Sequence, residues 1–440
     1  MKQKVHPVSN QRFSNGAYVI SVNMGYGHQR TAYPLKYLTP KGQIINANDY
    51  RSIPDKDRKI WEGTRWFYEL VSRLKRVPLI GETIFLIYDE FQKILSFYPK
   101  RDLSKPNFQL KQIFSLIKKG WGKNLIKKLS REPLPLISTF FIPAFMAEAF
   151  NYPGKIYCVV CDTDISRTWA PLNPSQSKIK YFAPNFRVVE RLKLYGVKSE
   201  NIFLTGYPLP TENITTDPSA GRLEILKNDL LHRFLNLDPQ GRYQYYYGAL
   251  IKKYLGELPS KTDHPLTLMF AVGGAGAQKE IGVKVVKSLA KKIKEKEVKV
   301  ILVAGVRKKV RDYFIQNIEK LGLKDNNVEI IFAENIEDYF QKFNQALRKT
   351  DILWTKPSEL SFYAALGLPI IIAPSIGSQE DFNKSWLLKS GFGNFQKDPR
   401  HTDQWLFDWL SQGYLAEAAM QGFIEGEKLG AFNIQKIVIK

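Results

Sequence analysis

Short apolar runs alternate with amphipathic stretches along most of this chain, and the runs end in glycine or polar residues. In the first half they predict strands at residues 17–22, 43–48, 134–140, 155–161, 180–183 and 201–206. In the second half they predict strands at residues 266–272, 298–304, 328–332, 352–355 and 369–373. Helical patterns fill the intervals. Because strands that alternate with helices form parallel sheets covered by helices, we expect an α/β protein.

Two segments interrupt the alternation and suggest how the chain is divided. Residues 55–131 are predicted to be helical and are rich in aromatic and basic side chains, and residues 211–264 combine polar turns with two predicted helices. A chain of 440 residues is also too long for one ordinary core. We therefore expect an N-terminal domain at 1–210, an insertion at 211–264 and a C-terminal domain at 265–402. The helical tail, 403–440, is expected to cross back to the first domain.

Each predicted domain opens with a strand, a glycine loop and a helical pattern. The first loop contains Gly25, Gly27 and His28, and the second contains Gly273, Gly274 and Gly276. Glycines let backbone N–H groups approach an anion closely, and the start of a helix adds partial positive charge. One such loop would be weak support. Two of them favour two Rossmann-like domains that face a shared cleft.

The positive charge of the chain is concentrated in its first half. The net charge is +23; residues 1–210 hold 33 Lys and Arg against 15 Asp and Glu, whereas residues 211–440 hold 32 against 27. Such a surface attracts lipid head groups, nucleic acid or a phosphorylated substrate. Nucleic-acid binding rests on charge alone, would show a steep salt dependence, and is not expected here.

Residues 111–131 offer two interpretations of this basic surface. Seven Lys and Arg and no acidic residue occur there. Apolar residues recur every four positions, at Ile113, Ile117, Trp121, Leu125 and Leu129. The pattern fits a helix lying in an anionic membrane interface, and it fits almost equally a helix packed on the core with a solvated lysine face. The charge asymmetry slightly favours the membrane.

Other features of the sequence narrow the cellular setting. Cys158 and Cys161 stand in a strand pattern with no second pair, which favours a buried structural role over a redox or zinc site. The first residues lack the apolar core of a signal peptide, and no stretch qualifies as a transmembrane helix. We expect a cytoplasmic protein without disulfides, peripheral on the inner face of the cell membrane.

The segment from Asp351 to Asn383 strengthens the case for a ligand site near the second glycine loop. A predicted strand delivers Lys356 to its carboxyl end, where Ser358 is expected to cap a helix with Glu359 in its first turn. The next strand leads to a polar loop at the same sheet edge, with Gln379, Glu380 and Asn383. Ligands of open α/β sheets bind at that edge. Simple capping would explain Ser358 and Glu359, whereas the later polar group can hydrogen-bond sugar hydroxyls.

Two residues of the first half are candidates for catalysis. His28 follows Gly27 at a helix start, which favours a neutral imidazole able to accept a proton or position an acceptor. The alternative is an ordinary polar loop residue. Asp162 and Asp164 form an Asp-x-Asp pair, for which metal binding is the less favoured interpretation. Asp162, at a strand end, is better read as a residue near the acceptor.

These motifs together resemble the GT-B glycosyltransferase group that contains monogalactosyldiacylglycerol synthases, processive diacylglycerol glucosyltransferases and MurG. The matching segments, in order over about 250 residues, are Met24–Arg30, Val159–Asp162 with Trp169, Pro184–Pro208, Gly273–Ala277, Thr355–Pro357, Gly367–Pro369 and Gly377–Asn383. The resemblance implies a UDP-sugar donor on the C-terminal domain, a membrane-bound acceptor on the N-terminal domain, and no metal or other cofactor. It implies that the Gly273–Gly276 loop holds the diphosphate, that Gln379, Glu380 and Asn383 read the sugar, and that His28 lies opposite.

One departure from the family pattern bears on activity. The ribose-binding Glu of the family corresponds here to Phe362, and Glu359 stands one turn earlier as a substitute. We predict a hexosyltransferase that moves sugar from a nucleotide-diphosphate donor to a lipid or lipid-linked acceptor at the membrane surface. The alternatives are a UDP-sugar epimerase of the same fold and a non-catalytic protein that binds nucleotide-sugar or membrane.

Overall fold

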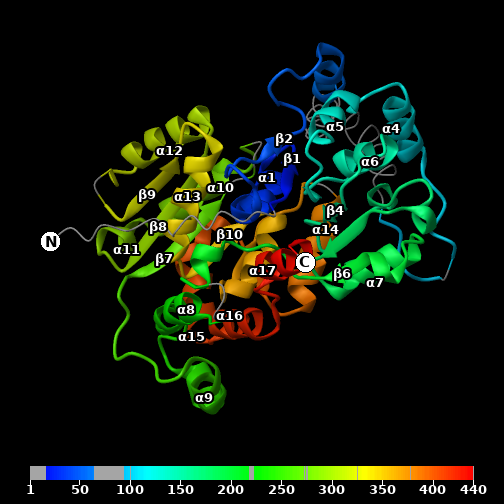
Figure 1. The fold of residues 1–440 in the computed structure, drawn as a ribbon. Helices are drawn as coiled ribbons and strands as arrows, with labels where there is room; N and C mark the ends of the chain where they lie inside the picture. The colour runs from blue at the N-terminus through cyan, green and yellow to red at the C-terminus, as the bar shows by residue number, and fades with distance from the viewer. Residues whose placement is uncertain are drawn as a thin grey trace.

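The computed structural model describes residues 16–63, 94–99, 101–217, 222–271, 273, 276–324, 326–376 and 378–439, and within these ranges it contains two parallel β-sheets (Figure 1). The first sheet consists of β1 (Tyr18–Ser21), β2 (Ile45–Asn46), β3 (Leu136–Ser138), β4 (Ile156–Val159), β5 (Lys180–Ala183) and β6 (Ile202–Leu204). The second consists of β7 (Leu266–Ala271), β8 (Val298–Gly305), β9 (Val328–Phe332), β10 (Ile352–Thr355), β11 (Ile370–Ile372) and β12 (Gly393–Phe395). The predicted α/β class with two Rossmann-like domains is confirmed.

Helices connect the strands of each sheet. In the first half they are α1 (Tyr26–Ala32), α4 (Phe108–Lys118), α5 (Lys123–Leu129), α6 (Phe141–Ala149) and α7 (Phe186–Leu194). The segment between the sheets contributes α8 (Glu224–Leu237) and α9 (Arg242–Leu255). In the second half they are α10 (Lys279–Ser288), α11 (Ala290–Lys294), α12 (Lys308–Lys320), α13 (Ile336–Leu347), α14 (Ser378–Lys389), α15 (Thr402–Ser411), α16 (Tyr414–Glu425) and α17 (Gly430–Val438).

The order of strands places one switch point in each sheet. The first sheet runs β2-β1-β3-β4-β5-β6: the chain passes from β1 outwards to β2 and then crosses back past β1 to β3, so the order reverses between β1 and β3. The second runs β12-β11-β10-β7-β8-β9, and its order reverses between β7 and β10. Crevices outside the carboxyl ends of strands at such points are the usual ligand sites of open α/β sheets. The first glycine loop follows β1 and the second follows β7, so both lie at switch points.

The central strands of both sheets are mostly apolar, because helices cover both faces and bury them. Every residue of β7, β10 and β11 is buried, and so is every residue of β3 and β4. A parallel sheet buried on both faces has this continuous apolar pattern rather than an alternating one. The short strand β12 was not predicted, because Gly393-Asn-Phe lacks a run of β-branched residues.

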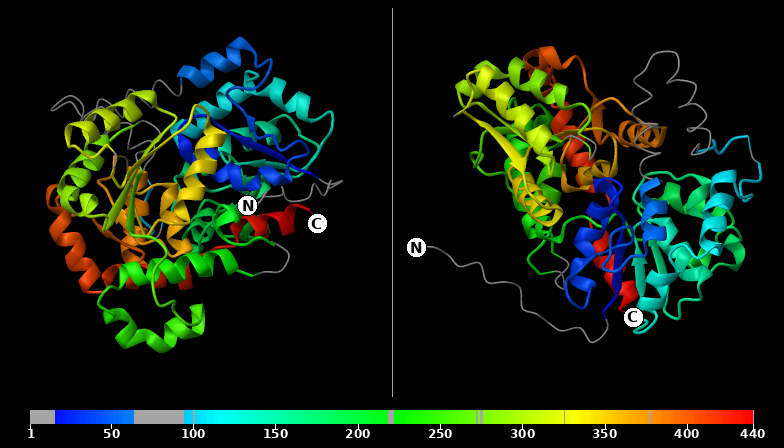
Figure 2. Two further views of the ribbon diagram at one scale, coloured as in Figure 1. Left: turned by 90° about the vertical axis from the view of Figure 1, so that its left-hand side faces the viewer. Right: turned by 90° about the horizontal axis from the view of Figure 1, so that it is seen from above.

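The end of the chain packs against the first domain. The hydroxyl of Tyr37 donates to Gln435 Oε1 over 3.1 Å, and Asn433 Nδ2 donates to the carbonyl of Thr205 over 2.9 Å. Ala431 and Ile434 of α17 lie in one apolar cluster with the first strand. The two further views show α17 beside the first sheet, with only four residues between it and the end of α16 (Figure 2). The last helix therefore joins the two halves.

The predicted membrane-facing helix at 111–131 is wrong in both shape and exposure. The turn at Gly120 and Gly122 divides it into α4 and α5. The five apolar residues that recur every four positions are all buried, and they pack in the same core as α6. The alternative, a helical segment on the core with solvated lysines, is the correct one. Of the surrounding prediction at 55–131, residues 64–93 lie outside the described part of the chain.

Within the ranges that the structure describes, no helix combines the length and apolar character needed to cross a bilayer.

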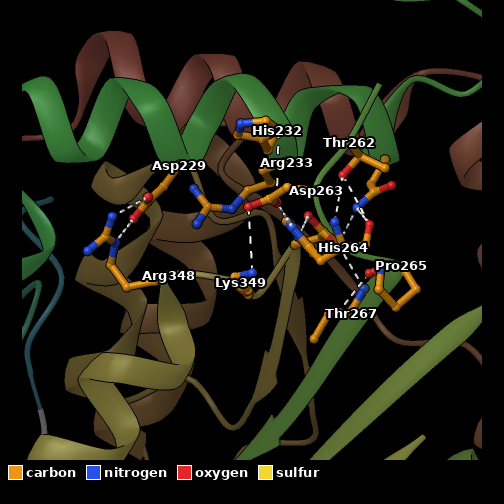
Figure 3. A network of polar contacts seen from close by, with 12 residues as sticks. Asp229, His232, Arg233, Thr262, Asp263, His264, Pro265, Thr267, Arg348 and Lys349 are labelled. Carbon is orange, nitrogen blue, oxygen red and sulfur yellow. Dashed lines mark hydrogen bonds and ion pairs between the residues drawn. The ribbon is translucent and has the colours of Figure 1, made fainter. Parts of the chain in front are cut away.

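A buried polar network fixes the amino-terminal edge of the second sheet (Figure 3). The carboxylate of Asp351, just before β10, accepts from the Thr267 N–H over 2.7 Å and from Asn236 Nδ2 over 2.9 Å. His264 Nε2 lies 3.1 Å from the same carboxylate, and His264 Nδ1 bonds Asp263. Arg233 of α8 donates to backbone carbonyls, including that of Thr350 over 2.7 Å. These contacts attach α8 to the sheet and provide hydrogen-bond partners for the buried charged groups of Asp351 and Arg233.

The network makes stability depend on the charge of His264. Burial alone would lower the pKa of His264, but the hydrogen bonds and charges of Asp351 and Asp263 outweigh it and raise the pKa. Because the pKa of His264 is higher in the folded protein than in the unfolded chain, its protonation stabilises the fold. This contribution is complete at pH values below the unfolded pKa, about 6.5, and is lost as the pH rises through the folded pKa.

We therefore expect His264→Gln to cost about 1–3 kcal/mol near pH 6 and less near pH 9, because it deprives a buried carboxylate of a cationic donor. Urea unfolding at both pH values measures the difference. The matched control is His401→Gln at an exposed histidine. Equal losses for His264→Gln at the two pH values would contradict the assignment.

Candidate active site

The first glycine loop places His28 at the carboxyl edge of the first sheet. Gly25 precedes α1 and has a φ of 117°, a backbone conformation that residues with a side chain rarely adopt. This conformation lets the chain turn from β1 directly into the helix. His28 then lies one turn into α1. Its ring packs 4.6 Å from that of Phe140, which follows β3 across the switch point.

The hydrogen bonds of His28 determine its tautomer. Nδ1 lies 2.8 Å from the carbonyl oxygen of Thr139, which can only accept, so Nδ1 carries the hydrogen and Nε2 keeps its lone pair. Burial lowers the pKa of His28 to about 4, against the opposing effects of the Thr139 carbonyl and the Glu359 charge. The ring is therefore neutral near pH 7, and the cause is burial. With so low a pKa, Nε2 of His28 is better suited to accept a hydrogen bond from a hydroxyl group than to remove the proton of that hydroxyl.

Asp162 has a pKa closer to neutrality than His28 does. Burial raises the pKa of Asp162 to about 6; Asn383 and Lys356 oppose this rise, and the charges of Glu359 and Glu380 add to it. The preceding Cys161 is buried, and its Sγ lies 3.4 Å from His28 Nδ1. Cys161, the residue before Asp162, is therefore in direct contact with His28.

The partner of Asp162 in the Asp-x-Asp pair has a structural role. The Asp164 carboxylate is buried and accepts from Arg191 Nε and Nη2, each over 2.8 Å. Arg187 Nε contacts it at 3.1 Å. Asp164 therefore joins the strand end to α7 through two guanidinium groups.

The second glycine loop lies against a lysine from the neighbouring strand. Gly276 donates its N–H to the Gly273 carbonyl over 2.7 Å, which closes a tight turn before α10. A Cβ at position 273 would lie only 2.5 Å from Cε of Lys356, so a side chain there would displace the end of this lysine. Lys356 follows β10 and also bonds Glu380. Gly274 lies outside the described residues.

The segment after Lys356 differs from the prediction. Residues Glu359–Leu366 form a 3₁₀-helix, and the Ser358 side chain makes no capping hydrogen bond. Glu359 is buried and pairs with Arg30 Nε of the first domain at 3.1 Å. Its other oxygen lies 3.2 Å from where a Cβ on Gly27 would be. Glu359 therefore contacts the first glycine loop from the opposite domain.

The predicted polar loop at 377–383 is instead the start of α14, because Glu380 and Asp381 provide acidic residues for its first turn. Glu380 accepts from the Ile376 N–H over 2.7 Å, and Gln379 is partly exposed. Asn383 is buried and reaches across the domains. Its Oδ1 accepts from the N–H and hydroxyl of Thr163 over 3.0 and 2.8 Å, and Nδ2 lies 3.4 Å from Asp162 Oδ1.

Two residues of the first loop that were not singled out join the domains. Tyr26 accepts from the Val306 N–H over 3.0 Å, at the end of β8. Arg30 donates to the Tyr339 hydroxyl over 2.7 Å. Its guanidinium also lies 4.3–5.9 Å from the ring centres of Tyr339, Phe340, Phe343 and Tyr363. The aromatic residues of α13 were the available signal for this contact.

Phe362, at the position of the family's ribose-binding Glu, packs between the domains. Its ring stacks on Tyr207 with centres 4.7 Å apart and an interplanar angle of 10°. It also contacts Trp386 of α14 at 5.4 Å. The site therefore brings together His28, Asp162, Lys356, Glu359, Glu380 and Asn383. Ser358 makes no capping bond, and among the described residues no contact assigns Gln379 a role.

Comparisons with known proteins give one family match and several structural likenesses. Residues 259–347 match the family described as "Domain of unknown function (DUF6938)". No curated protein sequence matches the chain.

Three solved structures illustrate the structural likeness. S. aureus MnaA in a co-structure with UDP is 12% identical, covers 97% of this chain and 95% of its own, and has a TM-score of 0.47. Acinetobacter baumannii MurG is 13% identical over 96% and 98% of the two chains, with a TM-score of 0.45. UDP-GlcNAc 2-epimerase from Neisseria meningitidis, bound to UDP-GlcNAc, is 13% identical over 81% and 87%, with a TM-score of 0.42. At these levels of similarity no function carries over to this chain.

The Arg30–Glu359 pair should be essential to the packing of the domains. We expect Arg30→Met to cost roughly 3–5 kcal/mol of unfolding free energy, because it leaves Glu359 buried and unpaired. Adding Glu359→Gln should recover part of the loss, which a double-mutant cycle in urea would measure.

The control for this prediction is Lys36→Met, which removes a lysine that pairs with Glu337 nearer the surface between the same domains. It should cost less than about 1 kcal/mol. A loss for Arg30→Met no larger than this would show that the buried pair is not essential.

Proposed function

We propose that this protein is a GT-B glycosyltransferase that moves a sugar from a nucleoside-diphosphate donor, UDP-sugar in the first instance, to a lipid or lipid-linked acceptor. The observation that carries the proposal is the contact of the first glycine loop and α1 with the residues that follow β8 and β10 across the domain boundary. A neutral His28 with a bare Nε2 lies on one side. A glycine turn with Lys356 against it lies on the other.

The proposed reaction assigns the two sides different tasks. A hydroxyl oxygen of the acceptor attacks the anomeric carbon of the sugar, and the bond from that carbon to the diphosphate oxygen breaks. The hydroxyl proton passes to a base, for which Asp162 has the more suitable pKa while His28 orients the hydroxyl. The leaving diphosphate carries the negative charge. Lys356 and N–H groups of the second glycine loop other than that of Gly276, which is bonded to the Gly273 carbonyl, would stabilise it, so the proposal needs no metal ion.

Donor recognition would combine the remaining residues of the C-terminal domain. Gln379 and Glu380 lie in the first turn of α14, and Asn383 lies one turn further on. In the present arrangement Asn383 is held by Thr163 and Glu359 by Arg30. Sugar or ribose binding by either residue would therefore exchange a contact between the domains for one to the donor, which requires the domains to shift.

A second candidate is a UDP-sugar epimerase of the same fold, and the carboxyl groups favour it. Asp162 has a pKa near 6 beside the charges of Glu359 and Glu380, which is suitable for taking and returning a proton at a sugar carbon. This candidate predicts turnover of free UDP-N-acetylhexosamine without a lipid. A non-catalytic binding protein, suggested by Phe362, predicts nucleotide binding without either turnover.

Calorimetry with UDP, GDP and TDP tests the donor site. At least one should bind, and Lys356→Ala should weaken that binding by about 2 kcal/mol, roughly thirtyfold, because it removes a charged partner of the diphosphate. Lys389→Ala, at the exposed end of α14, should leave the affinity unchanged. If none of the three diphosphates binds, the transferase and epimerase proposals both fail.

The pH dependence of turnover tests the two catalytic assignments. If ionised Asp162 is the base, turnover should rise with pH through about 6, and Asp162→Asn should abolish that limb. His28 is neutral above about pH 4, so His28→Ala should lower turnover by about 100-fold or more at every pH while sparing nucleotide affinity. Release of nucleoside diphosphate from the donor gives both rates. An unchanged pH profile in Asp162→Asn would remove Asp162 from the proton transfer.

A further inference from the structure

Helix α9 exposes an aromatic surface that the candidate active site does not use. The exposed fractions of Tyr245, Tyr246 and Tyr247 are 83%, 71% and 49%. The helix kinks at Tyr247, whose backbone dihedrals are not helical. Tyr243 before the kink packs on Phe234 of α8 with ring centres 5.8 Å apart, and Ile251 and Leu255 after it are buried. Three adjacent tyrosines exposed on a segment that is anchored on both sides of the kink form an unusual surface, and large exposed rings usually mark an interaction site.

The charges on the same helix specify the sign of the partner. Arg242, Lys252 and Lys253 are exposed, and the helix contains no acidic residue. Lys252 bonds Glu257 just beyond the helix, and Lys253 lies 5.5 Å from the ring of Tyr254. Asp238, which accepts from the N–H groups of Tyr243 and Gln244, is buried at the helix start. The exposed surface of α9 therefore combines rings with cations and favours an anionic partner.

The position of α9 distinguishes between anionic partners. Figures 1 and 2 show the helix projecting from the body of the protein, beyond α8 and α16. A single-stranded nucleic acid usually lies in a basic groove with stacking platforms, whereas a projecting helix presents a convex surface. Tyrosine rings with flanking lysines and arginines suit the head-group level of a flat bilayer.

We propose that α9 docks the protein on an anionic phospholipid surface through Tyr245 and Tyr246, with Arg242 and Lys253 on the head groups. The inference deepens the proposed function, on which it rests for the expectation of a lipid acceptor. It moves the membrane contact away from residues 111–131, whose apolar face is buried. Because α9 leads into the amino-terminal end of β7, the contact is separate from the glycine loop at the other end of that strand.

Flotation of the full-length protein tests the proposal, with vesicles of equal parts phosphatidylglycerol and phosphatidylcholine and with vesicles of phosphatidylcholine alone. The wild type should float with the anionic vesicles only. Arg242→Gln/Lys253→Gln should lower partitioning about 25-fold, taking about fivefold for each cation near an anionic surface. Tyr245→Ser/Tyr246→Ser should also lower it, including at salt concentrations that screen charge.

Phe186→Ser is the matched control, because it removes a ring that is 72% exposed on α7 of the basic domain. It should float as the wild type does. Nucleoside-diphosphate affinity should be unchanged in all variants, which shows that they fold and separates this test from that of the proposed function. Wild-type protein that stays unbound, or α9 variants that float like the wild type, would overturn the proposal. Binding of single-stranded RNA through α9 in place of vesicles would overturn it too.

Discussion

The arrangement of the site depends on one buried charge that must be neutralised across the domain boundary. Arg30 lies in α1 of the first domain, two residues after His28, and its side chain contacts Glu359 and the Tyr339 hydroxyl of the second domain. A guanidinium buried among aromatic rings is tolerated only where a carboxylate and hydrogen-bond acceptors meet it. The pair therefore fixes α1, and with it His28, relative to the 3₁₀-helix that follows Lys356. Tyr26 and Asn383 reinforce the same alignment from either side.

Burial also determines the electrostatic character of the candidate site. It acts on His28 and Asp162 in opposite directions. It disfavours the imidazolium, so the pKa of His28 falls to about 4, and it disfavours the carboxylate, so the pKa of Asp162 rises to about 6. In the proposed function, the catalytic tasks that the sequence pattern assigns to the histidine are therefore divided between these two residues.

The sequence predicted the fold well because its signals are local. Buried parallel strands read as apolar runs, and the glycines after β1 and β7 mark where each domain begins. It predicted less of the site, because the decisive contacts join residues about 200 to 330 positions apart, such as Thr163 with Asn383 and Arg30 with Glu359. The start of α14 was mistaken for a loop because its polar residues resembled a ligand-binding segment. The helix at 111–131 was misplaced because amphipathicity alone cannot tell a core from a membrane.

The position of Phe362 shows how these local and distant effects combine. A ribose-binding carboxylate at that position would lie where the rings of Phe362 and Tyr207 now stack between the domains. Glu359 is the nearest acidic residue in the sequence, but its charge is needed by Arg30. Under the proposed function, a nucleotide that binds Glu359 would have to offer Arg30 another anion, and the diphosphate of the donor carries that charge. Donor binding and loosening of the domain contact would then be the same event, with Arg30 exchanging one negative partner for another.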